Sequence, residues 1–261
     1  MLVCGVDVGC MFTKFVILRD GAPVAQHIME SSADGAAAIS ETLAQLLASV
    51  NSNSADLKAV VSCGLGRRSV VPLDKVISEI SACAGGARAV HARARTLIDL
   101  GAHGIRVAAL DERGRVANFD ISDKCASGTG CFLDIMSRAL GVEPLEAGKV
   151  ALCARNPEQI ESMCAVFGES EVVSLVARGS SREDILGGLV EAVSRRVASM
   201  VKRVGMEQDI LLAGGVAKNA ALRTALEKAL GSPVHLPDEP QTVGALGAAL
   251  VAQRLASGER R

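Results

Sequence analysis

The sequence GVDVGCMFTK, at positions 5–14, decides the fold, because it ends one apolar run and begins another. Residues 2–8 form an apolar run that predicts a buried strand, and residues 15–18 predict the strand that returns beside it. An Asp-Gly pair then provides the turn to a third predicted strand at residues 23–29. The N-terminus is therefore expected to form a strand–turn–strand unit with an acid at the end of its first strand.

A glycine turn that follows an acid at the end of a strand can bind a phosphate. The backbone N–H groups of the turn face the phosphate oxygens, and the carboxylate of Asp7 can reach a magnesium ion. Gly9 allows the tight backbone geometry, and Thr13 or Lys14 can touch the phosphate. An ordinary hairpin with a solvent-facing Asp7 is the alternative for this stretch taken alone.

The sequence TLIDLGAHGIRV, at positions 96–107, repeats this arrangement, with Asp99 lying 92 positions after Asp7. It again runs from an apolar strand through an acid, a glycine at Gly101 and a cation to a second apolar strand. An internal duplication is more informative than either copy alone. Two such hairpins facing each other would make a nucleotide site, in which His103 either contacts phosphate or faces solvent.

A third glycine-rich stretch, AGGVAKN at positions 213–219, lies between a predicted strand and a predicted helix. Gly214 and Gly215 would let a flat ring or a phosphate approach the backbone closely. A tight strand-to-helix turn that binds no ligand is the alternative.

Two cysteines occur in isolated contexts that suit a metal cluster. Cys125 lies in SDKCASGTG, positions 122–130, and Cys164 lies in SMCAVFGESE, positions 162–171. At the start of a helix, unpaired N–H groups and the helix dipole favour a thiolate or an anionic cluster. Neither cysteine belongs to a CxxC pair, so two copies of such a chain would be needed for a four-thiolate site.

The composition limits the remaining possibilities. The 261 residues suit one large domain or two ordinary ones, and the apolar runs are shorter than the ~18–20 residues that cross a bilayer. A net charge of −1 and the absence of Trp and Tyr argue against binding to nucleic acid or to a membrane surface. We expect a cytoplasmic protein without a disulfide framework, in which Cys4, Cys63 and Cys153 are core residues.

Together these stretches resemble the actin/hexokinase/Hsp70 ATPase superfamily. They are most similar to the ATPases that activate 2-hydroxyacyl-CoA dehydratases and to the related ATPase subunits of benzoyl-CoA reductase. The resemblance covers nearly the whole chain, and the order and spacing of its motifs are specific. It rests on residues 5–14, 78–81, 99–101, 123–130, 164–171, 213–219 and 244–250.

The resemblance implies an α/β, two-lobed actin-like (ribonuclease H-like) fold with duplicated mixed sheets that contain hairpins. Residues 1–95 would form the N-terminal lobe and residues 96–261 the C-terminal lobe, with the final helix able to pack back on the first. MgATP would bind in the cleft, where Asp7 and Asp99 position magnesium and the attacking water. The nucleotide contacts would be Gly9, Thr13, Lys14, Gly101, His103, Gly128, Gly214, Gly215, Asn219 and Gln241.

The resemblance also implies a dimer that holds one [4Fe–4S] cluster through Cys125 and Cys164 of each subunit. Ferredoxin or flavodoxin would supply electrons, and hydrolysis would drive them to an iron–sulfur dehydratase or reductase that acts on CoA thioesters. Activators continue the second phosphate turn as Gly-Gly-Gln-Asp, whereas this chain has GAHG at positions 101–104. That turn is closer to one of the two benzoyl-CoA reductase ATPase subunits. A homodimer and a heterodimer with a sister ATPase subunit therefore both stay open.

Two other functions are compatible with the same fold. A small-molecule kinase would need an acid placed as base beside a substrate hydroxyl, and the sequence has no further carboxylate motif of that kind. A regulatory subunit that binds nucleotide without hydrolysing it is the other alternative, and the altered turn at positions 101–104 is its main support.

Overall fold

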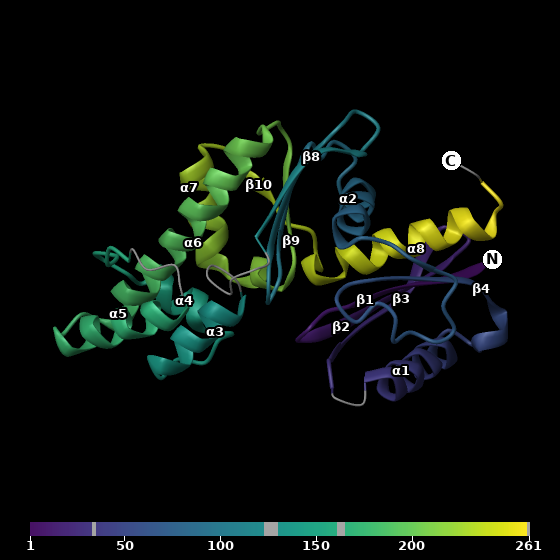
Figure 1. Cartoon of the computed structure of the whole chain (residues 1–261), viewed down its shortest axis with the longest axis horizontal. Coiled ribbons are helices and arrows are strands. Elements are labelled where there is room, and N and C mark those ends of the chain that lie inside the picture. Colours follow the sequence, from purple (N-terminus) through teal and green to yellow (C-terminus); the bar gives the residue numbers. More distant parts are fainter. Residues whose placement is uncertain (33–34, 123–129, 161–164, 260–261) are drawn as a thin grey trace. The chain divides into compact units, whose positions relative to one another are not determined.

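The chain folds into two compact units, each built on its own β-sheet (Figure 1). The structure is a computed structural model, and it describes residues 1–32, 35–122, 130–160 and 165–259. The first unit comprises Met1–Arg93, Leu110–Val116 and Gln241–Arg261, and the second comprises Ala94–Ala109 and Ala117–Pro240. The division expected at residue 95 stays a prediction.

The first unit contains a mixed five-stranded sheet in the order β3-β2-β1-β4-β5. The expected hairpins are present, because β1 pairs with β2 and β2 with β3 in antiparallel fashion, whereas β4 runs parallel to β1. The strands are β1 (Leu2–Val8), β2 (Phe12–Arg19), β3 (Ala22–Glu30), β4 (Leu57–Cys63) and β5 (Lys75–Val76).

The second unit repeats this topology, with its sheet ordered β10-β9-β6-β7-β8. Here β6 pairs antiparallel with β7 and parallel with β9, as β1 does with β2 and β4. The predicted duplication is thus confirmed at the level of strand order. The strands are β6 (Thr96–Leu100), β7 (Ile105–Leu110), β8 (Val116–Ser122), β9 (Ile210–Ala213) and β10 (Val234–His235).

Helices cover both faces of the first sheet. Alternate residues of β1 point to opposite faces, so Val6 and Val8 pack on α1 while Val3 packs on α8. Helix α8 approaches β1 closely because Gly5 has no side chain; a Cβ there would lie 2.1 Å from the Ala245 carbonyl oxygen. The helices of this unit are α1 (Gly35–Ser49), α2 (Glu79–Val90) and α8 (Val243–Ala256).

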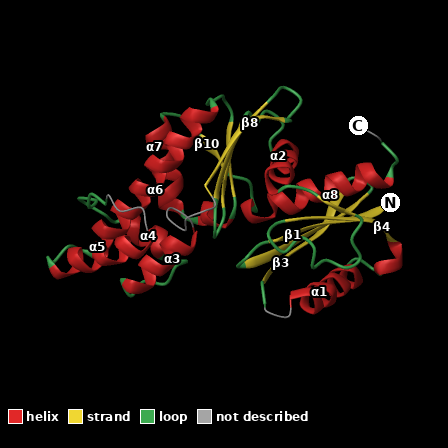
Figure 2. Ribbon diagram, viewed as in Figure 1, coloured by secondary structure: helices red, strands yellow, loops and turns green. Residues whose placement is uncertain are grey.

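The second sheet packs against a larger helical layer, in which α6 and α7 lie together beside the strands (Figure 2). The apolar spacing from Arg182 to Val204 predicts α6, and the serine before it, Ser181, caps its N-terminus. No helix in the described part of the chain is long and apolar enough to cross a bilayer. The helices here are α3 (Gly130–Ala139), α4 (Ala147–Leu152), α5 (Ala165–Ala177), α6 (Arg182–Val204) and α7 (Ala220–Leu230).

Candidate functional site

The first hairpin pairs its acid with a cation. Asp7 and Lys14 are direct cross-strand neighbours, and the Lys14 ammonium donates to Asp7 Oδ2 at 3.0 Å. Both side chains are mostly shielded, at 17% and 15% exposure. The Gly9 N–H donates to the Phe12 carbonyl at 3.1 Å and so closes the turn. A shielded pair of charges at the end of a strand is therefore present where the sequence predicts a phosphate turn.

The second hairpin repeats the main contacts of the first. Asp99 faces Arg106 across the strands, and the guanidinium donates to Asp99 Oδ2 at 3.3 Å. The Gly101 N–H donates to the Gly104 carbonyl at 2.9 Å. The Asp99 side chain is 10% exposed, so this carboxylate too interacts with a cation and has little contact with bulk water.

Each acid also lies against a glycine at the end of the neighbouring parallel strand. Gly214 has a φ of +89°, and a Cβ there would lie 2.3 Å from the Leu100 carbonyl oxygen and 2.7 Å from Asp99 Oδ1. Gly64 has a φ of +93°, and a Cβ there would lie 2.3 Å from the Val8 carbonyl oxygen and 2.7 Å from Asp7 Oδ1. From the sequence, the glycine-bearing turn at Gly64 favours a plain strand-to-loop connection, although the duplication would have marked Gly64 as the counterpart of Gly214.

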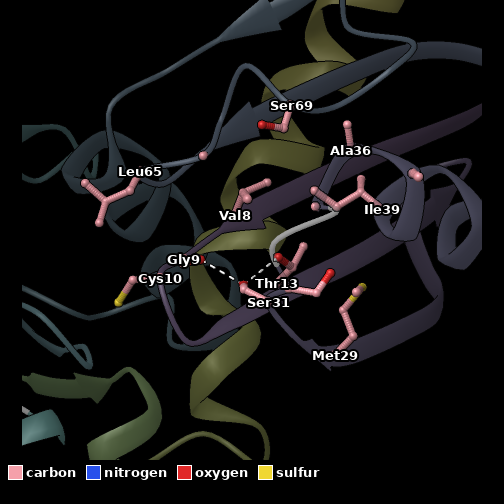
Figure 3. A pocket seen from close by; sticks show the side chains of 14 residues that line it. Val8, Gly9, Cys10, Thr13, Met29, Ser31, Ala36, Ile39, Leu65 and Ser69 are labelled. Carbon is pink, nitrogen blue, oxygen red and sulfur yellow. Dashed lines mark hydrogen bonds between the residues drawn. The ribbon is translucent and has the colours of Figure 1, made fainter.

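Thr13 lies on the opposite sheet face from Asp7. Its side chain is 1% exposed, and its hydroxyl lies 3.1 Å from that of Ser31, which donates to the Gly9 carbonyl at 2.9 Å (Figure 3). Thr13 and Ser31 thus support the predicted phosphate turn from the opposite sheet face and line a cavity of about 770 Å³ beside α1. Ser31 could not be singled out from the sequence, because it is 18 positions away from Thr13.

The double-glycine stretch connects β9 to α7 as predicted. Gly215 opens a short 3₁₀ helix, Gly215–Lys218, and the Asn219 side chain caps α7 by accepting from the Leu222 N–H at 3.1 Å. Asn219 therefore has a structural role that does not depend on a nucleotide. Gln241 lies in another 3₁₀ helix, Pro240–Thr242, and belongs to the first unit.

The cysteines separate into several environments. Burial raises the pKa of the Cys4 thiol to about 12, and Cys63 is also buried, as expected of core residues. The expectation for Cys153 is wrong, because this residue ends the short helix α4 and is exposed. His103 is exposed and its Nδ1 lies 3.8 Å from the Cys131 sulfur. The predicted ligands Cys125 and Cys164, and the predicted nucleotide contact Gly128, lie outside the described residues.

The donor atoms present fit the groups that the sequence implies. Carboxylate oxygens are the protein ligands that magnesium prefers, and Asp7 and Asp99 offer them beside turns with tight backbone geometry. The adjoining glycines, Gly64 and Gly214, add no side chain of their own beside either carboxylate. Thiolates are the usual ligands of iron–sulfur clusters, and the chain supplies two cysteines in suitable sequence contexts.

Comparison with known proteins identifies relatives that span almost the whole chain. The BadF/BadG/BcrA/BcrD ATPase family matches residues 4–252. A 2-hydroxyisocaproyl-CoA dehydratase activator from Clostridioides difficile is 38% identical, over 97% of this chain and 95% of the relative. One of the subunits of benzoyl-CoA reductase from Thauera aromatica is 30% identical, over 95% and 92% of the two chains.

A solved structure agrees with the fold. The activator of the 2-hydroxyisocaproyl-CoA dehydratase from Clostridium difficile, with bound ADPNP, superimposes with a TM-score of 0.92 at 38% identity. The match covers 99% of this chain and 96% of the other. The expected actin-like α/β fold class is confirmed.

Proposed function

Because the chain belongs to the BadF/BadG/BcrA/BcrD ATPase family, we propose that it hydrolyses MgATP to drive low-potential electrons into a partner iron–sulfur enzyme. The electrons would leave a [4Fe–4S] cluster shared by two subunits, and the partner would act on a CoA thioester. The relatives support this partner class, since one is an activator of a dehydratase and another is a subunit of a reductase.

The observation that carries the proposal is the pair of matching hairpins. Each hairpin has a shielded acid, a cation 3.0–3.3 Å away and a glycine packed on the acid. Such preorganised charges and backbone N–H groups suit the stabilisation of a phosphoryl group in transfer, where electrostatic contributions dominate. Hairpins with only a structural role would not be expected to share the same acid, cation and packed glycine.

The residues of the two hairpins can be assigned roles. The N–H groups of Gly9 and Gly101 donate within their own turns, so other backbone N–H groups of the two turns would hold phosphate oxygens, and Lys14 would add positive charge there. Asp7 would hold magnesium, which when bound neutralises phosphate charge. Asp99 would orient the attacking water by accepting a hydrogen bond from it. The backbone at Gly214 and Gly215 would lie under the adenosine.

The electron-transfer part depends on the two cysteines. Cys125 and Cys164 of each subunit would hold a [4Fe–4S] cluster, which when bound supplies a one-electron centre whose potential depends on charge, hydrogen bonds and exposure. ATP can drive the transfer only if it binds one conformation of the protein better than another. The second subunit would be a copy of this chain or a sister ATPase subunit.

Hydrolysis of MgATP by anaerobically purified protein tests the ATPase role. Asp7→Asn and Asp99→Asn are expected to lower kcat by roughly 100-fold, as for loss of a group that positions the reacting atoms. Glu41→Gln, an exposed acid on α1, is the matched control and should retain the wild-type rate. Phosphorylation of an added small molecule would instead support the kinase, and binding without hydrolysis would support a regulatory subunit.

A further inference from the structure

Arg106 occupies, in the second hairpin, the place that Lys14 has in the first. Each cation faces its acid across the two strands and follows it by seven positions along the chain. The strand neighbours of Arg106, Ile105 and Val107, point into the core of the second unit. Strand alternation therefore puts Arg106 on the opposite face of the sheet, beside its acid. The proposed roles use Lys14 as a source of positive charge and give none to Arg106.

The guanidinium of Arg106 lies beside the second turn as well as beside the acid. A Cβ on Gly101 would lie 3.5 Å from Arg106 Nη1. In the first turn, a Cβ on Gly9 would likewise lie 3.1 Å from Lys14 Nζ. Each turn thus has a cationic head group next to its glycine, where a bound phosphate would meet the backbone and the cation together.

Stability alone does not account for the burial of this ion pair. The side chains of Arg106 and Asp99 are 16% and 10% exposed, whereas those of Arg203 and Asp120, a pair in the same unit, are 59% and 29% exposed. Burying two charges costs free energy that their attraction does not always repay, and apolar residues of similar size are often as stable. The distance of 3.3 Å from Arg106 Nη1 to Asp99 Oδ2 is also longer than the ~2.7–2.9 Å of a usual charge-assisted hydrogen bond. A shielded cation in a loose pair beside a turn suits the binding of an anion.

We propose that Arg106 is a catalytic residue whose guanidinium binds the terminal phosphoryl group of ATP during its transfer to water. The inference rests on the proposed function, because it assumes that the second turn binds this group. In the group being transferred, negative charge is spread over three equatorial oxygens. A planar guanidinium can donate to two oxygens at once, whereas the Lys14 ammonium acts as a compact point charge. The cation with the fork geometry is therefore in the hairpin whose acid would orient the attacking water.

The transfer step accounts for every atom and charge. The oxygen of the water molecule oriented by Asp99 forms a bond to the terminal phosphorus, while the bond from that phosphorus to the bridging oxygen breaks. ADP leaves with the electron pair of the broken bond. One proton of the water stays on the phosphate product, and the other is released to solvent. Because arginine side chains stay protonated in proteins, Arg106 stabilises the developing charge without exchanging a proton.

ATP hydrolysis by two variants of Arg106 tests this role. Arg106→Gln should lower kcat by about 100-fold or more, since arginines that contact the transferred phosphoryl group contribute large factors. Its affinity for MgADP, which lacks that group, should stay within about threefold of wild type. Arg106→Lys keeps a cation beside Asp99 but loses the planar fork, so it should recover no more than about a tenth of the wild-type kcat. Arg203→Gln is the matched control, because it removes an exposed arginine that also pairs with an aspartate, and it should keep the wild-type rate.

Binding of MgADP together with aluminium fluoride provides a measurement that a purely structural role would not change. Aluminium fluoride mimics the phosphoryl group during transfer, so it reports interactions that are made in the transition state. Arg106→Gln should weaken the binding of this mimic by about the same factor as it lowers kcat. The binding of MgADP alone should change by no more than about threefold.

The outcomes separate this inference from the proposed function. A wild-type kcat in Arg106→Lys would show that any cation beside Asp99 suffices, and would overturn the role of the guanidinium. Equal losses of affinity for MgADP and for the mimic would show that Arg106 only supports the turn, which also overturns the inference. If the wild-type protein does not hydrolyse MgATP, the proposed function and the inference fail together. Hydrolysis by the wild type with a rate within threefold in Arg106→Gln would overturn the inference alone. Arg106→Lys, which retains the ion pair, decides the question if Arg106→Gln does not fold.

Discussion

Substitution of Gly214 by alanine would place a methyl group inside the contact between β9 and β6. The added Cβ would lie 2.3 Å from the Leu100 carbonyl oxygen, 2.6 Å from its carbonyl carbon and 2.7 Å from Asp99 Oδ1. Two of these three atoms are backbone atoms of a central strand, so a change of side-chain rotamer cannot relieve the overlap. The strand end or the candidate catalytic acid must move.

The expected cost has two parts. The backbone at Gly214, with φ +89° and ψ 170°, lies in a region that is essentially restricted to glycine and costs other residues about 1–3 kcal/mol. Overlap with packed backbone atoms adds about 1–3 kcal/mol. The free energy of unfolding should therefore fall by about 2–6 kcal/mol, a large fraction of the ~5–15 kcal/mol that stabilises a typical protein.

Urea unfolding of Gly214→Ala and of a control separates the two parts. Gly179 has a similar φ of +86° but nothing within 4 Å of its Cβ position, so Gly179→Ala carries only a backbone cost of about 1–2 kcal/mol. Gly214→Ala should also lose MgATP affinity, because Asp99 is displaced. If the two variants are equally stable and Gly214→Ala binds MgATP as wild type does, the packing of Asp99 on this glycine has been misjudged.

Three further predictions concern charge and thiol chemistry. Lys14→Met removes the cation beside Asp7 and should lower the free energy of unfolding in urea by about 1.5–3 kcal/mol; a loss below about 0.5 kcal/mol would contradict the pairing. Burial raises the pKa of Cys4 to about 12, so iodoacetamide at about pH 9 should modify this thiol only after unfolding, and modification of the folded protein would disprove its burial. Hydrogen bonds from the Asn156 N–H and the Ser181 hydroxyl hold the pKa of Asp184 below its ordinary value. The stability this carboxylate provides is present above its unfolded pKa and is lost as the pH falls through its folded pKa. Asp184→Asn should therefore have a Tm that changes less between about pH 5 and pH 2 than that of wild type, and parallel Tm curves would refute this.

The first strands of both sheets could be predicted from the sequence because they form hairpins, in which the paired residues are close in the chain. The repeat of acid, glycine and cation predicted both turns. A serine followed by an acid is typical of a helix start, and Ser78 before Glu79 does cap α2, with its side chain accepting from the Ser81 N–H. Helix α4 was not predicted, because six residues are too few to show helical periodicity. The same short helix leaves Cys153 exposed, where an apolar context had suggested the core.

The parts of the site that could not be predicted depend on contacts between distant segments. The brace from Ser31 to Gly9 spans 22 positions, and the packing of Gly64 on Asp7 depends on the register of two parallel strands. Strand alternation, by contrast, could have shown that Thr13 and Lys14 point to opposite faces and so cannot both share the face of Asp7. Residue spacing thus located the turns, whereas tertiary packing decides which side chains reach each acid.

Iron and acid-labile sulfide per chain, measured after strictly anaerobic purification together with subunit stoichiometry, test the central claim most directly. A [4Fe–4S] cluster shared by two copies predicts about two irons and two sulfides per chain. Cys125→Ala and Cys164→Ala should each abolish the cluster, while Cys153→Ala, which changes an exposed thiol, should retain it. Iron that appears only when a second ATPase chain co-purifies would identify a heterodimer. Absence of iron under both conditions, in protein that still binds ATP, would contradict the electron-transfer account.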